Sequence, residues 1–385
     1  MSRRNFFMFA IVLLALLHSY IGWRLLPDLP VATMWRDLGA LYLALSCAVI
    51  PLGMLARGIK RQPLADRLAW LGFLSMGLFS SLLILTVLRD VTLLGGWSIT
   101  RAVAPAAVVA LPSWTMYSAI AAPVLALLVT LIGFINARRI AQVIHVDVPL
   151  ANLPAELHGF TIAQISDVHV GPTIKRNYLK RIVERINGLD ADIVAITGDL
   201  VDGRVSELTF HTAPLADIKT RYGSYFVTGN HEYYSNAPEW ITELKRLGLR
   251  VLLNEHVVVS HNNAALVVAG ITDFSGGQFD PAHRSDAQAA IAGAPVDATK
   301  LLLAHQPRSV DDAAKAGFDI QLSGHTHGGQ FWPWNFFVPL QQPYTAGLHR
   351  FKNMWIYVSR GTGYWGPPKR FGAPSEITRL RLVRA

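Results

Sequence analysis

Five polar clusters in the second half of the chain carry side chains that can bind metal ions and move protons. They are Ser166-Asp167-Val168-His169, Gly198-Asp199-Leu200-Val201-Asp202-Gly203, Gly229-Asn230-His231-Glu232, His305 and Gly324-His325-Thr326-His327-Gly328-Gly329-Gln330. Imidazole nitrogens with carboxylate and amide oxygens suit Mn, Fe or Zn better than Mg alone. Two such ions about 3.5–4 Å apart can clamp the attacking and leaving oxygens of a phosphoryl group, so the clusters predict metal-assisted phosphoester hydrolysis.

The spacing within the clusters favours one shared site. In Asp167-x-His169 and His325-x-His327, residues two apart project to the same side if the backbone stays extended. Adjacent glycines let the backbone turn sharply and approach the ions. The prediction rests on the order of all five clusters together. Taken singly, a histidine is usually structural, and an Asp before a Gly more often marks a turn. That weaker interpretation applies to His158, His211, His256, His261, His283 and His349.

Each cluster directly follows a short apolar run that predicts a buried strand. The runs are Phe160–Ile165, Ile193–Thr197, Tyr225–Thr228, Leu301–Ala304 and Ile320–Leu322. Between the first two, Lys175–Leu189 places its apolar residues on one helical face. This alternation predicts an α/β domain with largely parallel connections over residues 150–385. The clusters then gather at the carboxyl ends of the strands, where open α/β sheets build their sites.

Residues 1–140 differ in composition and predict a membrane domain. Uncharged apolar runs cover residues 5–23, 38–56, 68–88 and 116–136. About 20 mostly apolar residues allow a helix to cross the hydrocarbon core, so each run predicts a transmembrane helix. Buried helices of a soluble protein are the alternative, which four such runs in succession disfavour.

The net charge of +9 is concentrated near these spans, with +7 in residues 1–150. A nucleic-acid binder would concentrate basic residues on its folded domain, so no nucleic-acid partner is expected. The basic residues before span one, between spans two and three and after span four are Arg3, Arg4, Arg57, Lys60, Arg61, Arg67, Arg138 and Arg139. This bias predicts that both termini and the hydrolase domain are cytoplasmic. The single cysteine, Cys47, excludes an intramolecular disulfide and cysteine zinc sites.

The first residues offer an alternative topology. The sequence of Ser2–Phe7 resembles the start of a twin-arginine export signal, which would carry the downstream domain outward. No small-residue cleavage site follows it, and three further spans do. The two arginines are therefore interpreted as the inner flank of span one.

At the five clusters, residues 150–385 resemble the calcineurin-like metallophosphoesterase superfamily. The Gly-His-Thr-His-Gly-Gly-Gln form is most similar to its bacterial membrane-associated branch. The resemblance implies a four-layer α/β sandwich of two mixed β-sheets flanked by helices, which follows the predicted N-terminal α-helical transmembrane region. Together with the four predicted spans, the similarity to a bacterial membrane-associated branch gives the expectation of a multi-pass protein of the bacterial inner membrane. The membrane region itself lies outside the resemblance and rests on hydropathy.

The resemblance also implies roles for the cluster residues. One divalent ion would be held by Asp167, His169, Asp199 and His327, and a second by Asp199, Asn230, His305 and His325. Asp199 would therefore bridge the two ions, for which Mn²⁺ is the first expectation and Fe, Zn or Mg the alternatives. His231 would protonate the leaving oxygen or steady the transition state, and Asp202 would orient its ring. No ligand position departs from the family pattern, which argues against an inactive relative.

An aromatic segment follows the last cluster and suggests the substrate class. It contains Phe331, Trp332, Trp334, Phe336 and Phe337, with Tyr364 and Trp365 further on. Such a segment either packs its own core or meets the lipid interface, where Trp and Tyr are favoured. The resembled branch includes phosphodiesterases and a UDP-2,3-diacylglucosamine pyrophosphatase, so a lipid-linked phosphodiester or pyrophosphate is expected, with Trp332 and Trp334 as substrate contacts.

Two other functions stay open on the sequence alone. The same metal core would serve a nuclease or a protein phosphatase, although the near-neutral domain offers such substrates little basic surface. A non-catalytic membrane scaffold or sensor would use the metals only to stabilise its fold. The intact ligand set and His231 argue against that interpretation.

Overall fold

The computed structural model describes residues 3–59, 61–103 and 111–385. The chain divides into two compact units, Met1–Ile135 with Gly366–Pro368, and Asn136–Trp365 with Lys369–Ala385. Ser2 and Lys60, which entered the topology prediction, lie outside the described residues.

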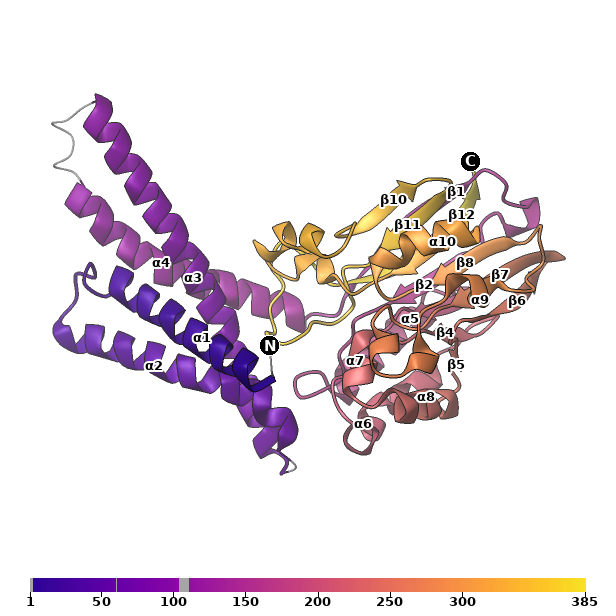
Figure 1. Ribbon diagram of the computed structural model, residues 1–385, viewed down its shortest axis with the longest axis horizontal. Coiled ribbons are helices and arrows are strands. Elements are labelled where there is room, and N and C mark those ends of the chain that lie inside the picture. Colours follow the sequence, from indigo (N-terminus) through magenta and orange to yellow (C-terminus); the bar gives the residue numbers. More distant parts are fainter. Residues whose placement is uncertain (1–2, 60, 104–110) are drawn as a thin grey trace. The chain divides into compact units, whose positions relative to one another are not determined.

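The first unit is helical (Figure 1). Its helices are α1 (Arg3–Leu25), α2 (Thr33–Leu55), α3 (Leu64–Val103) and α4 (Leu111–Arg138), with a short 3-10 turn at Ala56–Gly58. Within the described residues, these four helices are long and apolar enough to cross a membrane. The helix α3 continues well past residue 88, where its apolar run ends. The first two charged residues beyond that point, Arg89 and Asp90, form ion pairs inside the unit, as in the 2.8 Å contact between Arg24 Nε and Asp90 Oδ2.

The second unit contains two mixed β-sheets. One has the strand order β1-β12-β2-β3-β4-β5 and the other β10-β11-β9-β8-β7-β6. The strands of the first are β1 (Gln142–Leu150), β12 (Glu376–Arg384), β2 (Thr161–Ile165), β3 (Ile193–Ile196), β4 (Ser224–Phe226) and β5 (Arg250–Val251). Those of the second are β10 (Gly347–Phe351), β11 (Met354–Val358), β9 (Ile320–Ser323), β8 (Thr299–Leu303), β7 (Ala264–Gly270) and β6 (Glu255–His261). The five predicted strands are β2, β3, β4, β8 and β9, and neighbours along the chain among them pair in parallel within each sheet.

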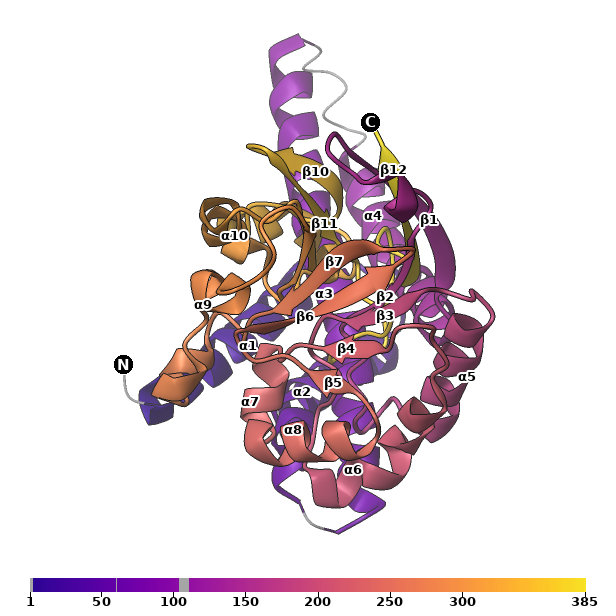
Figure 2. The same ribbon diagram turned by 90° about the vertical axis from the view of Figure 1, so that its right-hand side faces the viewer.

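Three apolar cores hold these sheets in a four-layer sandwich. The central core lies between the sheets and contains Phe160 and Leu322. The outer face of the first sheet packs on α5 (Arg176–Asn187) and α8 (Ala237–Arg246), where Trp240 is fully buried. The outer face of the second packs on α9 (Ala287–Ile291) and α10 (Val310–Ala316). Figure 2 shows α5 on one side of the paired sheets and α9 and α10 on the other. The predicted two mixed sheets flanked by helices are thus confirmed.

Candidate metal centre

The polar clusters meet where β2, β3, β4, β8 and β9 end. Among the described residues, three sets have possible metal-binding atoms within 4.8 Å of one another. The sets are Asp167, His169 and His327; His169, Asp199 and His231; and Asp199, His305 and His325. Asp199 and His169 each belong to two sets. The structure therefore brings the sequence-predicted histidines and aspartates into one continuous group.

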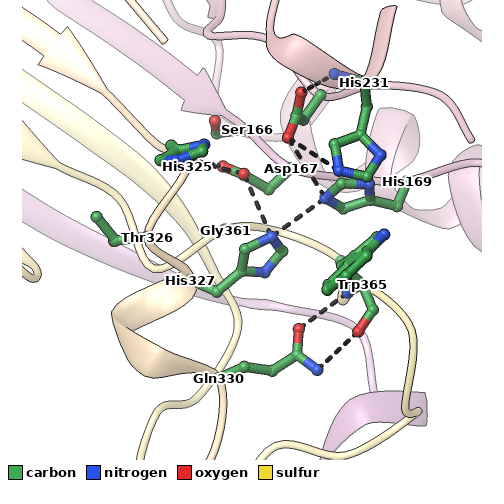
Figure 3. Close-up of polar contacts among 12 residues, drawn as sticks. Ser166, Asp167, His169, His231, His325, Thr326, His327, Gln330, Gly361 and Trp365 are labelled. Carbon is green, nitrogen blue, oxygen red and sulfur yellow. Dashed lines mark hydrogen bonds and ion pairs between the residues drawn. The ribbon is translucent and has the colours of Figure 1, made fainter. Parts of the chain in front are cut away.

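The first predicted ion site is built from β2 and the turn after β9 (Figure 3). His327 Nε2 lies 3.1 Å from His169 Nε2 and 3.3 Å from Asp167 Oδ1. Asp167 is fully buried, and both of its carboxylate oxygens accept the backbone N–H of His325 at 3.0 Å. Two ring nitrogens and a carboxylate oxygen thus converge from separate strand ends.

The second predicted ion site lies between the two sheets' strand ends. His305 Nε2 is 3.2 Å from Asp199 Oδ2 and 3.1 Å from His325 Nδ1. The other ring nitrogen of His305, Nδ1, lies 2.7 Å from the carbonyl of Thr197, which directs Nε2 into the site. Asn230 Oδ1 is buried and accepts no hydrogen bond from the described residues. A buried acceptor without a donor is costly, and a divalent cation would satisfy it. The donor set present therefore fits the two-ion site that the resemblance implies.

Burial adjusts the protonation of these ligands. Desolvation lowers the pKa of His325 to about 3 and that of His327 well below its usual value. Both rings are therefore neutral at pH 7 and keep a lone pair, which metal binding requires. Burial by itself would raise the pKa of Asp199, but the neighbouring His305 and His231 charges hold it well below the usual range. Asp199, the predicted bridging ligand, is accordingly an ionised carboxylate.

The backbone at the ligands departs from the sequence expectation. Asp167, His169, Asp199, His325 and His327 all have positive φ, between 51° and 68°. The assumption of an extended backbone in Asp-x-His and His-x-His is therefore wrong. Left-handed backbone at non-glycine residues costs on the order of 1–3 kcal/mol each and persists only where the surroundings enforce it. Here the backbone turns at each of these five residues, so their convergence does not depend on strand alternation.

Two glycines allow the ligand side chains to pack directly on the backbone. A Cβ at Gly324 would lie 2.2 Å from Asp167 Oδ2, and one at Gly229 would lie 2.2 Å from Asp199 Oδ1. Both distances are far inside van der Waals contact, so any larger residue would displace a carboxylate.

Glu232 supports the site, although sequence reasoning gave it no role. Its buried carboxylate accepts four backbone N–H groups, from Asp199, Leu200, Val201 and Gly229. It thereby joins the loop after β3 to the loop after β4. Its place directly after His231 in the third cluster was the only sequence signal.

His231 lies beside the ligands and is held from two directions. Its Nδ1 contacts Asp202 Oδ1, and its backbone N–H donates to Asp199 Oδ1 at 2.8 Å. Asp202 Oδ2 also lies 3.3 Å from His169 Nδ1, so one carboxylate serves two rings. Burial alone would raise the pKa of Asp202, but the charges of His169 and His231 lower it well below its usual value. His231 Nε2 is 3.9 Å from Asp199 Oδ2, at the edge of the ligand group.

Two aromatic rings lie beside His231. Tyr234 and Trp365 lie 5.2 and 5.6 Å from the imidazole centroid, both edge-on. Trp332 and Trp334, the predicted substrate contacts, are about two-fifths exposed in the segment after β9. Their role in substrate binding stays a prediction. Sequence reasoning missed Tyr234, which directly follows the third cluster and Tyr233.

The remaining domain histidines that were interpreted as structural have structural partners. His158 accepts the backbone N–H of Arg384, and His256 and His349 contact the carbonyls of Ala290 and Ala346. The others contact nearby groups in the same way: His211 with the Arg176 N–H, His261 with the Tyr222 hydroxyl and His283 with the Tyr233 hydroxyl.

Known proteins are similar to this chain in sequence. A transmembrane protein with metallophosphoesterase domain from Danio rerio is 39% identical over 274 residues, which cover 68% of this chain and 63% of that protein. The chain thus matches less than two-thirds of the length of that relative. An uncharacterized metallophosphoesterase from Aquifex aeolicus is 33% identical over 226 residues, covering 57% of this chain and 84% of the relative.

Solved structures and a family model were also matched. A dimetal phosphatase from Danio rerio superposes with a TM-score of 0.34 and 13% identity, covering 53% of this chain and 88% of that one. The calcineurin-like phosphoesterase family model matches residues 160–329, which contain the five polar clusters except Gln330 at the end of the fifth. The chain therefore belongs to the calcineurin-like phosphoesterase family.

Proposed function

We propose that this chain is a membrane-anchored phosphoesterase that uses two divalent metal ions to hydrolyse phosphodiester or pyrophosphate bonds. The observation that carries the proposal is the convergence of two ligand sets on one shared carboxylate, Asp199, with His231 beside it. A site with a single structural ion would need neither the shared carboxylate nor a second, separately oriented histidine.

Each ion would have its own protein ligands. Asp167, His169, Asp199 and His327 would hold one, and Asp199, Asn230, His305 and His325 the other. Mn²⁺ is the ion we propose first, because the set mixes imidazole nitrogens with carboxylate and amide oxygens. When bound, such ions activate a water for attack and neutralise charge on the phosphoryl group.

The residues next to the ligands would supply proton transfer and orientation. His231 would give a proton to the departing oxygen, and Asp202, in contact with its Nδ1, would fix the orientation of the ring. The burial of both side chains keeps competing water away from this contact.

We also propose a lipid-linked substrate at the cytoplasmic face of a bacterial inner membrane. The support is the four helices able to span a membrane and an exposed apolar segment in the catalytic unit. The exposed residues of that segment are Trp332, Trp334, Phe336, Phe337 and Leu340. Exposed Trp and Phe side chains suit the lipid interface, where their rings leave water. A nucleotide-lipid such as UDP-2,3-diacylglucosamine falls in this substrate class.

The test measures turnover by the purified full-length chain in detergent. Hydrolysis of bis-p-nitrophenyl phosphate should vanish after chelation and return with Mn²⁺. His305→Ala should abolish it, whereas His349→Ala, which removes a histidine bonded to the Ala346 carbonyl, should not. A metal-loaded protein without turnover would refute the enzymatic proposal. A panel of lipid phosphodiesters and nucleotide-lipids then tests the substrate class, and strongly salt-sensitive cleavage of nucleic acid would favour a nuclease instead.

A further inference from the structure

The rings beside His231 are exposed although the histidine itself is buried. The exposed fractions are 58% for Tyr234 and 42% for Trp365, against 7% for His231. Figure 3 shows Trp365 next to the histidines of the centre. Large apolar surfaces left in water next to a reactive group are typical of a ligand site, because a bound molecule removes them from water.

Trp365 is held in place by Gln330. The Gln330 side chain donates to the Trp365 carbonyl and accepts the Trp365 N–H, both at 2.9 Å (Figure 3). Gln330 is buried and has a φ of 59°, so its own backbone is in the strained left-handed region. The last residue of the fifth cluster thus fixes the backbone of Trp365 by a paired amide contact.

The Tyr234 ring packs against a residue from a later segment of the chain. It ends α7 (Asn230–Tyr234), and its ring meets Phe279 edge-on at 5.7 Å. Phe279 is itself half exposed and also stacks on Tyr233 at 5.5 Å. The aromatic surface on this side of His231 therefore extends over two rings.

We infer that Tyr234 and Trp365 form a subsite for the leaving group, which takes an alcohol bearing an aromatic or aliphatic group next to its hydroxyl. The inference rests on the proposed hydrolase function. A proton donor must come within about 2.6–3.2 Å of the leaving oxygen. The ring centroids of Tyr234 and Trp365 lie 5.2 and 5.6 Å from the centroid of the His231 ring. The carbon atoms attached to the leaving oxygen would therefore contact these two rings.

The reaction balances with water as the second reactant. The water oxygen bonds to phosphorus, and the bond from phosphorus to the leaving oxygen breaks with its electron pair on that oxygen. His231 gives its proton to the resulting alkoxide and is later reprotonated, while the proton from water goes to solvent. The products are a phosphomonoester and the free alcohol. Flat or apolar groups on that alcohol gain ring contact, whereas charged groups lose hydration there.

Methyl benzyl phosphate tests the subsite within one molecule. Methanol and benzyl alcohol have similar acidity, so the ratio in which the metal-loaded full-length enzyme releases them reports which group occupies the leaving position. We expect benzyl alcohol to exceed methanol roughly tenfold, the scale of one aromatic stacking contact. Trp365→Ala and Tyr234→Ala should each move the ratio toward one, and Trp365→Phe should retain most of it. Phe210→Ala, which removes an exposed ring that lies over Arg176, is the matched control.

A double-mutant cycle tests the positioning role of Gln330. Gln330→Ala should lower the ratio in the wild-type background and leave it unchanged in the Trp365→Ala background, since Gln330 acts through Trp365. A wild-type ratio near one, or a ratio unaffected by both aromatic substitutions, would overturn the subsite while leaving the hydrolase proposal standing. Absence of any turnover by the metal-loaded wild type would overturn both.

Discussion

Replacing Glu232 by glutamine would test whether this buried carboxylate holds the two ligand loops together. Its Oε1 accepts the N–H groups of Leu200 at 2.8 Å and Val201 at 3.3 Å. Its Oε2 accepts those of Asp199 at 3.0 Å and Gly229 at 2.7 Å. The side chain is fully buried, so water cannot replace it. Glutamine has nearly the same shape but only one oxygen, and its NH₂ group would face two donors.

The magnitude follows from the number of donors left without an acceptor. Two buried N–H groups would lose their partner in either orientation of the amide, and each costs about 1–3 kcal/mol. Burial and the Asp199 charge raise the pKa of Glu232 to about 8. At a pH above that value, where Glu232 is a carboxylate, we therefore expect Glu232→Gln to lower the free energy of unfolding of the second unit by roughly 2–6 kcal/mol. Because the donors include the backbone of Asp199, metal affinity should fall as well.

Urea unfolding of the full-length chain in detergent, read by hydrogen exchange in peptides from β3 and β4, measures this change. Glu184→Gln is the control: its carboxylate is 61% exposed and 3.8 Å from Lys180, so its effect should stay within about 0.5 kcal/mol. A loss of less than about 1 kcal/mol for Glu232→Gln, with metal content unchanged, would refute the loop-joining role.

Three further predictions concern the bridge, the topology and the acid. Asp199→Asn should abolish activity and weaken metal binding more than any other single ligand change, because its carboxylate offsets the repulsion of two ions. Two ions still bound at wild-type affinity in a metal analysis would contradict the bridge. A topology reporter fused after Ala385 should give the signal of a cytoplasmic location. If the reporter is alkaline phosphatase, activity of the fusion would instead support export directed by Ser2–Phe7. His231→Ala should keep both metals and lose about 10²–10⁴-fold in kcat/KM on an alkyl diester, but much less on a p-nitrophenyl ester, whose leaving group needs no proton. Equal losses on both substrates would remove His231 from the acid role.

The local sequence pattern was sufficient to predict part of the fold of this protein. The strands β2, β3, β4, β8 and β9 follow from short apolar runs, and α5 follows from its single apolar face. These features depend on neighbours a few residues apart, which hydrophobic periodicity records. The order of the polar clusters likewise identified the residues that meet at the strand ends, because carboxyl ends of parallel strands share one edge.

Other features required the folded chain. The edge strand β1 pairs in parallel with β12, joining Gln142 to Glu376, and no local pattern connects segments so far apart. The positive φ angles at the ligands, the four N–H donors on Glu232 and the approach of Trp365 to His231 are equally non-local. Each is strained or costly alone and is stabilised only by packing and hydrogen bonds from other segments. The sequence by itself determined which residues could do the chemistry, and only the tertiary structure decided what holds them in position, because that support comes from segments distant along the chain.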